Sequence, residues 1–212
     1  MQLDTLQELK KAITGYDSEK ASTLSHKVLE EGIDPNVAVE AVTEAIRFIG
    51  NEFSQEKIWL PELVGAADAM KSSMQVLEKE ILDKGKKRES LGKVVIGTVK
   101  GDIHSIGEGM VATLLLAEGF EVLDMGVDVS VGDFIEAVKK NEPAILALSA
   151  LMTTTAKEME NIIENLKKEG LREKVKLIVG GAPITASFAE GIGADGFSAT
   201  APGGAKTARK LV

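Results

Sequence analysis

The spacing of apolar residues changes once along this chain, at about residue 88, and that change limits the folds open to it. Before that point apolar residues recur at steps of three and four, as in Val39, Val42, Ile46, Ile49 and Phe53. This spacing is typical of amphipathic helices. After that point apolar residues come in short unbroken runs with helical stretches between them. We therefore predict a helical domain followed by an α/β domain.

The first part, residues 1–88, is expected to hold four helices with short connections. Asp17 is a capping residue for the second helix. A proline in the first turn marks the start of two further helices, at Pro35 and Pro61. Four amphipathic helices predict an all-α helical-bundle domain. The charged tract 84–90 has no apolar periodicity and is interpreted as the linker.

The second part, residues 89–212, alternates between strands and helices. The expected strands are 94–99, 121–126, 144–149, 176–181 and a short last one at 196–198. The expected helices are 106–118, 130–140, 154–169 and 184–191, with another at the C-terminus. Because the main strands are continuously apolar, we predict a parallel five-stranded sheet with helices on both faces. This is the flavodoxin-like (Rossmann-like) doubly wound fold, which binds ligands beyond the carboxyl ends of its strands.

Composition excludes several kinds of site. The chain has 212 residues, a net charge of -8 and no cysteine. An acidic chain lacks the basic surface that nucleic-acid binding requires. Without cysteine there is neither thiolate catalysis nor a Cys-ligated metal site. No apolar run approaches the ~18 residues of a membrane span, and the N-terminus lacks a secretory signal. We therefore expect a cytoplasmic protein with no nucleic-acid or membrane partner.

A glycine-flanked turn, Gly101–Gly107, follows the first expected strand and holds one of the two histidines. It lacks the Lys-Ser/Thr pair of a phosphate loop and the third glycine of a dinucleotide fingerprint. A phospho-receiver domain needs a carboxylate at the end of the third strand, where this chain has Ser149. The spacing Asp102-x-His104 suits a metal-binding imidazole oriented by a carboxylate. It equally suits a capping Asp beside a solvated His, and the residues alone leave both interpretations open.

Three motifs at strand ends together resemble the signature of cobalamin-binding domains. The D-x-H-x-x-G, S-x-L and G-G elements correspond to Asp102-x-His104-x-x-Gly107, Ser149-Ala150-Leu151 and Gly180-Gly181. The helical first part resembles the cap bundle that precedes this domain in methionine synthase and in corrinoid proteins of methyltransferase systems. The resemblance covers nearly the whole chain. A chain of this size is similar to the corrinoid carriers of methylamine, methanol, betaine or methoxy-aromatic methyltransferases.

The resemblance implies cobalamin or a related corrinoid bound in the base-off/His-on mode. His104 is then the lower axial ligand of cobalt, and Asp102 holds its other ring nitrogen. Thr155 ends the hydrogen-bond relay where the family has a serine, and a threonine hydroxyl can donate and accept as well. These three are the candidate catalytic residues. Protonation of the relay is expected to favour reduced cobalt.

The nucleotide arm is implied to pass between the sheet and its flanking helices, with Ser149 bonded to the displaced base. Gly107 leaves room at the start of the first helix of this domain. The candidate cofactor-binding residues are Gly101, Asp102, Ile103, His104, Ser105, Ile106, Gly107, Ser149, Leu151, Thr153, Gly180, Gly181, Met70 and Met74. The last two belong to the cap, which is implied to cover the methyl-bearing face of the corrin. A methionine stripe at helical spacing is also what helix packing produces, so which cap residues face the ring stays open.

The implied function is that of a methyl carrier. A substrate-specific methyltransferase of the barrel type methylates cob(I)alamin on this protein, and a second methyltransferase passes the methyl group to tetrahydrofolate or a thiol coenzyme. A reductive activase is a further implied partner. The chain is not expected to catalyse a reaction alone, but to serve as the corrinoid subunit of a multi-component methyltransferase. The methyl donor, the final acceptor, the upper axial ligand and the oligomeric state stay open.

Two other cobalamin-dependent classes are alternatives. One is a cobalamin-binding sensor or regulator without its own catalysis; such proteins usually carry a DNA-binding or signalling module, and the sequence shows no basic winged-helix segment. The other is the small subunit of an adenosylcobalamin mutase, which needs no helical cap. The helical first part therefore favours the methyl carrier.

Overall fold

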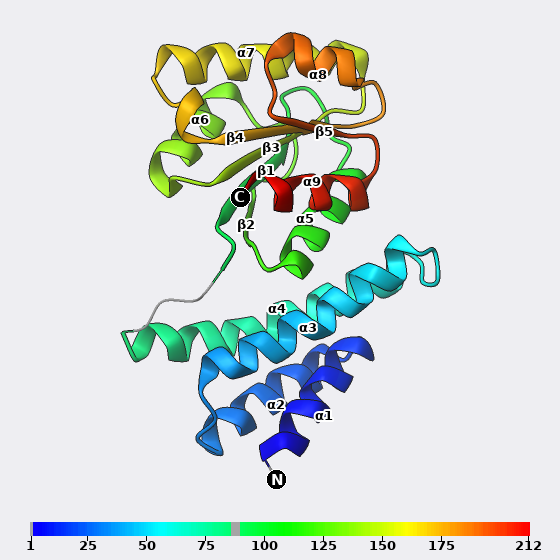
Figure 1. Cartoon of the computed structure of the whole chain (residues 1–212), viewed down its shortest axis with the longest axis vertical. Helices are drawn as coiled ribbons and strands as arrows, with labels where there is room; N and C mark the ends of the chain where they lie inside the picture. The colour runs from blue at the N-terminus through cyan, green and yellow to red at the C-terminus, as the bar shows by residue number, and fades with distance from the viewer. Residues whose placement is uncertain (1, 86–89) are drawn as a thin grey trace. The chain divides into compact units, whose positions relative to one another are not determined.

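The computed structural model describes residues 2–85 and 90–212 of the chain, which is shown in Figure 1. It divides into two compact units, Met1–Ser90 with Leu116–Gly119, and Leu91–Leu115 with Phe120–Val212. The predicted boundary at residue 88 and most of the predicted linker lie on residues 86–89, outside the described residues. Both therefore stay predictions.

The first unit is a helical bundle, as predicted. In the described residues its helices are α1 (Gln2–Thr14), α2 (Ser18–Glu30), α3 (Pro35–Ser54) and α4 (Leu60–Asp83). Three of these helices begin as predicted. Asp17 caps α2 by accepting the Lys20 N–H at 2.9 Å, and α3 and α4 both have proline in the first turn. No helix within the described ranges is long and apolar enough to cross a membrane.

Apolar side chains from all four helices fill the interior of this unit. The large, almost fully buried ones include Leu9, Ile13, Ile46, Leu63, Met70, Leu77 and Ile81. Ser25 of α2 and Ser73 of α4 are also buried, and their hydroxyl oxygens lie 2.6 Å apart. The Ser25 hydroxyl donates to the carbonyl of Ala21 at 2.8 Å, which leaves its oxygen to accept from Ser73. Both buried hydroxyls are thereby satisfied, and the pair joins α2 to α4.

The second unit is built on a parallel sheet with the strand order β2-β1-β3-β4-β5. The strands are β1 (Lys93–Thr98), β2 (Glu121–Asp124), β3 (Ile145–Ser149), β4 (Lys176–Gly180) and β5 (Gly196–Ser198). The connecting helices are α5 (Ile106–Glu118), α6 (Val131–Asn141), α7 (Thr153–Lys168), the short 3-10 turn η1 (Arg172–Lys174), α8 (Ala186–Ile192) and α9 (Ala201–Leu211). In Figure 1, α6, α7 and α8 cover one face, and α5 and α9 cover the other. The predicted five-stranded doubly wound fold is confirmed.

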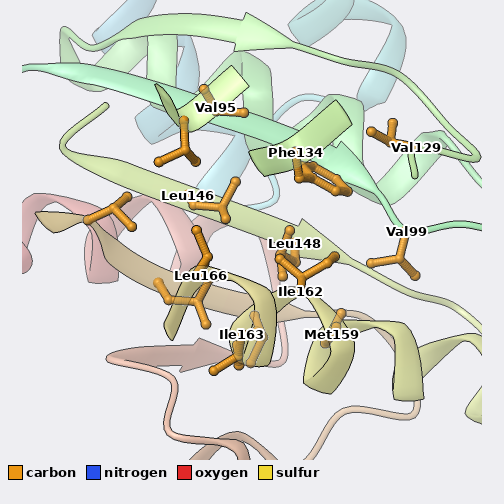
Figure 2. Packing of buried hydrophobic residues seen from close by; sticks show 14 of the residues in the cluster. Val95, Val99, Val129, Phe134, Leu146, Leu148, Met159, Ile162, Ile163 and Leu166 are labelled. Atoms are coloured by element: carbon orange, nitrogen blue, oxygen red, sulfur yellow. The ribbon is translucent and has the colours of Figure 1, made fainter. Parts of the chain in front are cut away.

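Alternating side chains give the two faces of the sheet different surroundings. Leu146 and Leu177 belong to a buried cluster shared with α6 and α7, part of which Figure 2 shows. The next residue along each of these strands, Ala147 or Ile178, instead lines a cavity on the side of α5 and α9. One face is therefore solid core, and the other leaves space close to the carboxyl ends of the strands.

Candidate functional site

The loop between β1 and α5 is held from both sides by Asp128, which lies after β2. The N–H of Gly101 donates to Oδ1 of Asp128 at 2.7 Å, and the N–H of Asp128 donates to the carbonyl of Asp102 at 2.9 Å. Gly101 and Asp128 both have positive φ values, of 81° and 55°. Glycine and aspartate adopt this region more readily than most residues. These reciprocal bonds fix the backbone on either side of Asp102.

Asp102 and His104 form the expected pair. The side chain of Asp102 is fully buried, whereas that of His104 is 47% exposed. Oδ1 of Asp102 lies 2.7 Å from Nδ1 of His104 and accepts the His104 backbone N–H at 3.1 Å. An ionised carboxylate only accepts, so Nδ1 carries the hydrogen, and in the neutral imidazole Nε2 is then the nitrogen with the lone pair. Nε2 has no hydrogen-bond partner among the described residues and is free to bind a ligand.

The other carboxylate oxygen ties the pair to the start of α7. Oδ2 of Asp102 accepts the N–H of Leu151 at 2.7 Å, the N–H of Met152 at 3.3 Å and the hydroxyl of Thr155 at 2.8 Å. Burial by itself raises the pKa of Asp102, but hydrogen bonds from His104, Leu151 and Thr155 outweigh it and hold the pKa below its ordinary value. The structure thus brings the three candidate catalytic residues into one hydrogen-bonded chain.

A cavity of about 610 Å³ opens beside His104, between the sheet and helices α5 and α9. Most candidate cofactor-binding residues of the second unit line it: Ile103, His104, Ser105, Ile106, Gly107, Ser149, Leu151, Gly180 and Gly181. Gly101 and Asp102 belong to the same loop but not to the lining. Thr153 begins α7, is exposed and also lies outside the lining.

Three large apolar side chains of the lining are exposed to solvent. Ile103 is 74% exposed, Ile106 71% and Leu151 45%. Exposed apolar side chains grouped beside an exposed imidazole are typical of a ligand-binding surface. The site therefore offers a ligand apolar contacts, one imidazole nitrogen and an adjoining cavity.

The candidate glycines differ in what a side chain would meet. A Cβ at Gly107 would have nothing within 4 Å, so this position borders open space. Gly181 has a φ of 123°, and a Cβ there would lie 1.8 Å from the carbonyl oxygen of Ala150. The backbone of Ala150, just after β3, therefore already requires glycine at position 181. The family resemblance implies a further reason for glycine at position 181, which is that the nucleotide arm passes close to this backbone.

We expect the Gly181→Ala variant to lose stability while Gly107→Ala, its matched control, does not. Alanine at 181 forces the ends of β3 and β4 apart at a strained φ, at a cost of about 2–4 kcal/mol in the free energy of unfolding. Alanine at 107 enters open space in a helix and should change that free energy by less than about 1 kcal/mol. Urea denaturation of the ligand-free proteins measures both. Equal stabilities of the two variants would contradict this explanation of Gly181.

The two candidate residues of the helical unit are buried. Met70 is 1% exposed and Met74 is 6% exposed, both on α4. Their burial favours the helix-packing interpretation of the methionine stripe, and their contact with a corrin stays a prediction. Trp59, at the start of the same helix, is 73% exposed.

Glu108 is a cavity residue that the sequence analysis missed. It lies in the first turn of α5, lines the cavity and is 3% exposed. Burial and the carboxylate of Asp124 raise its pKa to about 8. A signal was present in the sequence, because Glu108 is the one charged residue in the largely apolar stretch between Ile106 and Ala117.

The metal-binding groups of the site suit a metal ion whose other ligands come from a cofactor and not from the protein. No cluster of three or more His, Cys, Asp or Glu side chains that could hold an ion is found within residues 2–85 and 90–212. The site offers one imidazole with a free Nε2, an apolar rim and a cavity. A corrin ring supplies most ligands of its cobalt itself, so one axial imidazole and room for the nucleotide arm are what the protein needs to provide.

The chain matches two family models. A model described as a B12 binding domain matches residues 92–204, and a second model with the same description matches residues 5–78. Trimethylamine corrinoid protein 1 of Methanosarcina acetivorans is 44% identical over 200 residues, or 93% of each chain. Dimethylamine corrinoid protein 2 of the same organism is 37% identical and covers 99% of this chain and 96% of that one.

The fold and the site therefore define a two-domain cobalamin-binding protein. The crystal structure of the methanol:cobalamin methyltransferase complex MtaBC from Methanosarcina barkeri contains a similar chain, with a TM-score of 0.86 and 26% identity over 96% of this chain and 77% of that one. The chain belongs to the family of corrinoid proteins of methylamine and methanol methyltransferase systems.

Proposed function

We propose that the chain carries methyl groups on a corrinoid that is bound base-off/His-on. Nε2 of His104 is the lower axial ligand, and the displaced nucleotide base lies in the cavity. The observation that carries the proposal is the 2.7 Å contact between Oδ1 of Asp102 and Nδ1 of His104. It leaves Nε2 as the free nitrogen of a half-exposed imidazole beside the cavity.

The hydrogen bonds around Asp102 give this imidazole its orientation and basicity. A carboxylate that accepts the Nδ1 hydrogen makes Nε2 a stronger donor to a metal. Thr155 and the Leu151 N–H hold the buried carboxylate in its ionised form. Asp102, and Thr155 through it, therefore act as positioning residues for His104.

The cavity supports the second half of the proposal. Its volume of about 610 Å³ lies within the ~300–1,000 Å³ that is usual for small-molecule sites. Its lining is mainly apolar, which suits an uncoordinated aromatic base. Ser149 ends β3 and lines the cavity, and we assign it as a hydrogen-bond partner for that base.

When bound, the corrinoid cobalt supplies the position that accepts and releases a methyl group. The residues of the chain set axial ligation and exclude the nucleotide base from that position. The similar chain in MtaBC stands in complex with a methyltransferase. We infer a barrel-type methyltransferase as the first partner here, with a second methyltransferase and a reductive activase as the others. The names of the relatives favour methylamines as the methyl donors.

The two proposed domains divide this work. We place the helical cap domain at residues 1–88 and the corrinoid domain at residues 89–212. The cap is proposed to shield the methyl-bearing face, with Met70 and Met74 among the residues to be tested.

Methylation by a partner enzyme tests the proposal. The cobalamin-loaded, reduced protein is mixed with candidate methyltransferases and a donor panel of mono-, di- and trimethylamine and methanol. We expect the corrinoid absorbance to change with one enzyme and its own donor, and not when either is omitted. A loaded protein that no methyltransferase of these donor classes methylates would contradict the carrier function and favour a sensor.

A further inference from the structure

Among the residues that the structure describes, Glu108 is the one in the cavity lining whose side chain has an unsatisfied buried oxygen. Its Oε1 atom has no hydrogen-bond partner among the described residues, although the residue is only 3% exposed. A buried acceptor without a donor carries a desolvation penalty. Glu108 is a lining residue of the cavity, so a small rotation of its side chain brings Oε1 to a ligand that can supply the missing donor.

The surroundings of Glu108 favour its neutral form. Burial and the Asp124 carboxylate, which is hydrogen-bonded to it from the end of β2, raise the pKa of Glu108 to about 8. Two adjacent carboxylates share one proton more readily than they bear two charges. Among the described residues, the other titratable side chain of the lining is His104. The cavity wall is therefore uncharged at position 108 near neutral pH, with one oxygen left as an acceptor.

We propose that Oε1 of Glu108 accepts a hydrogen bond from a sugar hydroxyl of the corrinoid's nucleotide arm. Glu108 thereby selects corrinoids that carry a complete nucleotide. The inference rests on the proposed corrinoid site and adds a residue to it.

The donor class follows from what the arm can offer. The phosphodiester has acceptors only and a negative charge, and an uncoordinated benzimidazole attached through its other nitrogen has no N–H. The sugar hydroxyls donate, as does the amide of the linker between ring and nucleotide. A neutral glutamic acid can lie near the phosphate without repelling it, whereas a carboxylate at the same place would weaken binding.

The test compares two variants and two corrinoids. Glu108→Leu removes the acceptor, and Glu108→Gln keeps an acceptor for the ligand and a donor for Asp124. Cobalamin carries the nucleotide, whereas cobinamide keeps the linker amide and ends before the sugar. Dissociation constants are measured by absorbance titration, and the stability of the ligand-free proteins by thermal unfolding.

We expect Glu108→Leu to weaken cobalamin binding about tenfold and to leave cobinamide binding within about twofold of wild type. Glu108→Gln should bind cobalamin as wild type does. The ligand-free Leu variant should melt no lower than wild type, because it loses a buried unsatisfied oxygen. Wild-type affinity for cobalamin should fall as pH rises through about 8, where Glu108 ionises, and that of the Gln variant should not.

Three results distinguish a failure of the proposed role of Glu108 from a failure of the proposed corrinoid-binding function. Unchanged cobalamin affinity in Glu108→Leu would overturn the role of Glu108 and leave the corrinoid site intact. Equal weakening for both corrinoids would overturn the assignment to the sugar, since the lost contact would then lie on the linker or ring. A wild-type protein that binds neither corrinoid would overturn the proposed function itself.

Discussion

The His104→Gly variant is expected to bind cobalamin without a nitrogen ligand from the protein. The glycine leaves Asp102 without its ring partner and leaves cobalt with water below the ring. The absorbance spectrum of the bound cobalt(III) form should therefore become that of a base-off corrinoid. We expect affinity to fall by at least about tenfold, because the one protein–metal bond is lost while the cavity contacts remain.

Added imidazole and a second histidine serve as controls for this result. Free imidazole should occupy the space of the missing ring and restore the nitrogen-ligated spectrum. His26 is exposed on α2, and its replacement by glutamine should leave spectrum and affinity unchanged. A wild-type spectrum in His104→Gly without added imidazole would contradict the assignment of the lower ligand.

Replacing Asp102 by alanine is expected to lower the stability of the ligand-free protein strongly. Five donor groups converge on its buried carboxylate: the N–H and Nδ1–H of His104, the N–H groups of Leu151 and Met152, and the hydroxyl of Thr155. Without an acceptor, those that water cannot reach stay unsatisfied. We expect a loss of about 2–4 kcal/mol in the free energy of unfolding of the ligand-free protein.

Two comparisons sharpen the Asp102 experiment. Asp68 is exposed on α4, and its change to alanine should alter the free energy of unfolding by less than about 0.5 kcal/mol. Asp102→Asn retains the shape but replaces one acceptor oxygen by an NH₂ group, so it should fall between alanine and wild type. Urea denaturation followed by circular dichroism measures all three. An Asp102→Ala variant as stable as Asp68→Ala would show that the carboxylate is not needed to hold the loop.

Local patterns made much of the fold and part of the site predictable. Continuous apolar runs predicted the parallel strands, and α5 begins at Ile106, where the turn Gly101–Gly107 predicted a strand-to-helix transition. The Asp102–His104 contact was foreseeable because the two residues are two positions apart on one turn. Thr155 was named from the family resemblance, and the fold brings its hydroxyl to the same carboxylate.

Contacts between segments that are far apart in the sequence could not be predicted from local patterns. Nothing near Asp128 in the sequence indicates that it holds the Gly101 loop, because that contact spans 27 positions and depends on the order of β1 and β2. Met70 illustrates another limit. Helical periodicity identifies an apolar face but not whether that face meets another helix or a ligand. Glu108 illustrates a third limit, because an acidic residue in the first turn of a helix also suits the helix dipole and does not indicate a buried site.

Electron paramagnetic resonance of the cobalt(II) form most directly tests the bond between His104 and cobalt. The protein is made with histidine labelled with the heavier nitrogen isotope, in the His26→Gln background, and loaded with unlabelled cobalamin. If Nε2 of His104 is the axial ligand, each cobalt line should be split into a doublet by the labelled nitrogen. A triplet, as given by ordinary nitrogen in the cofactor's own base, would contradict the account.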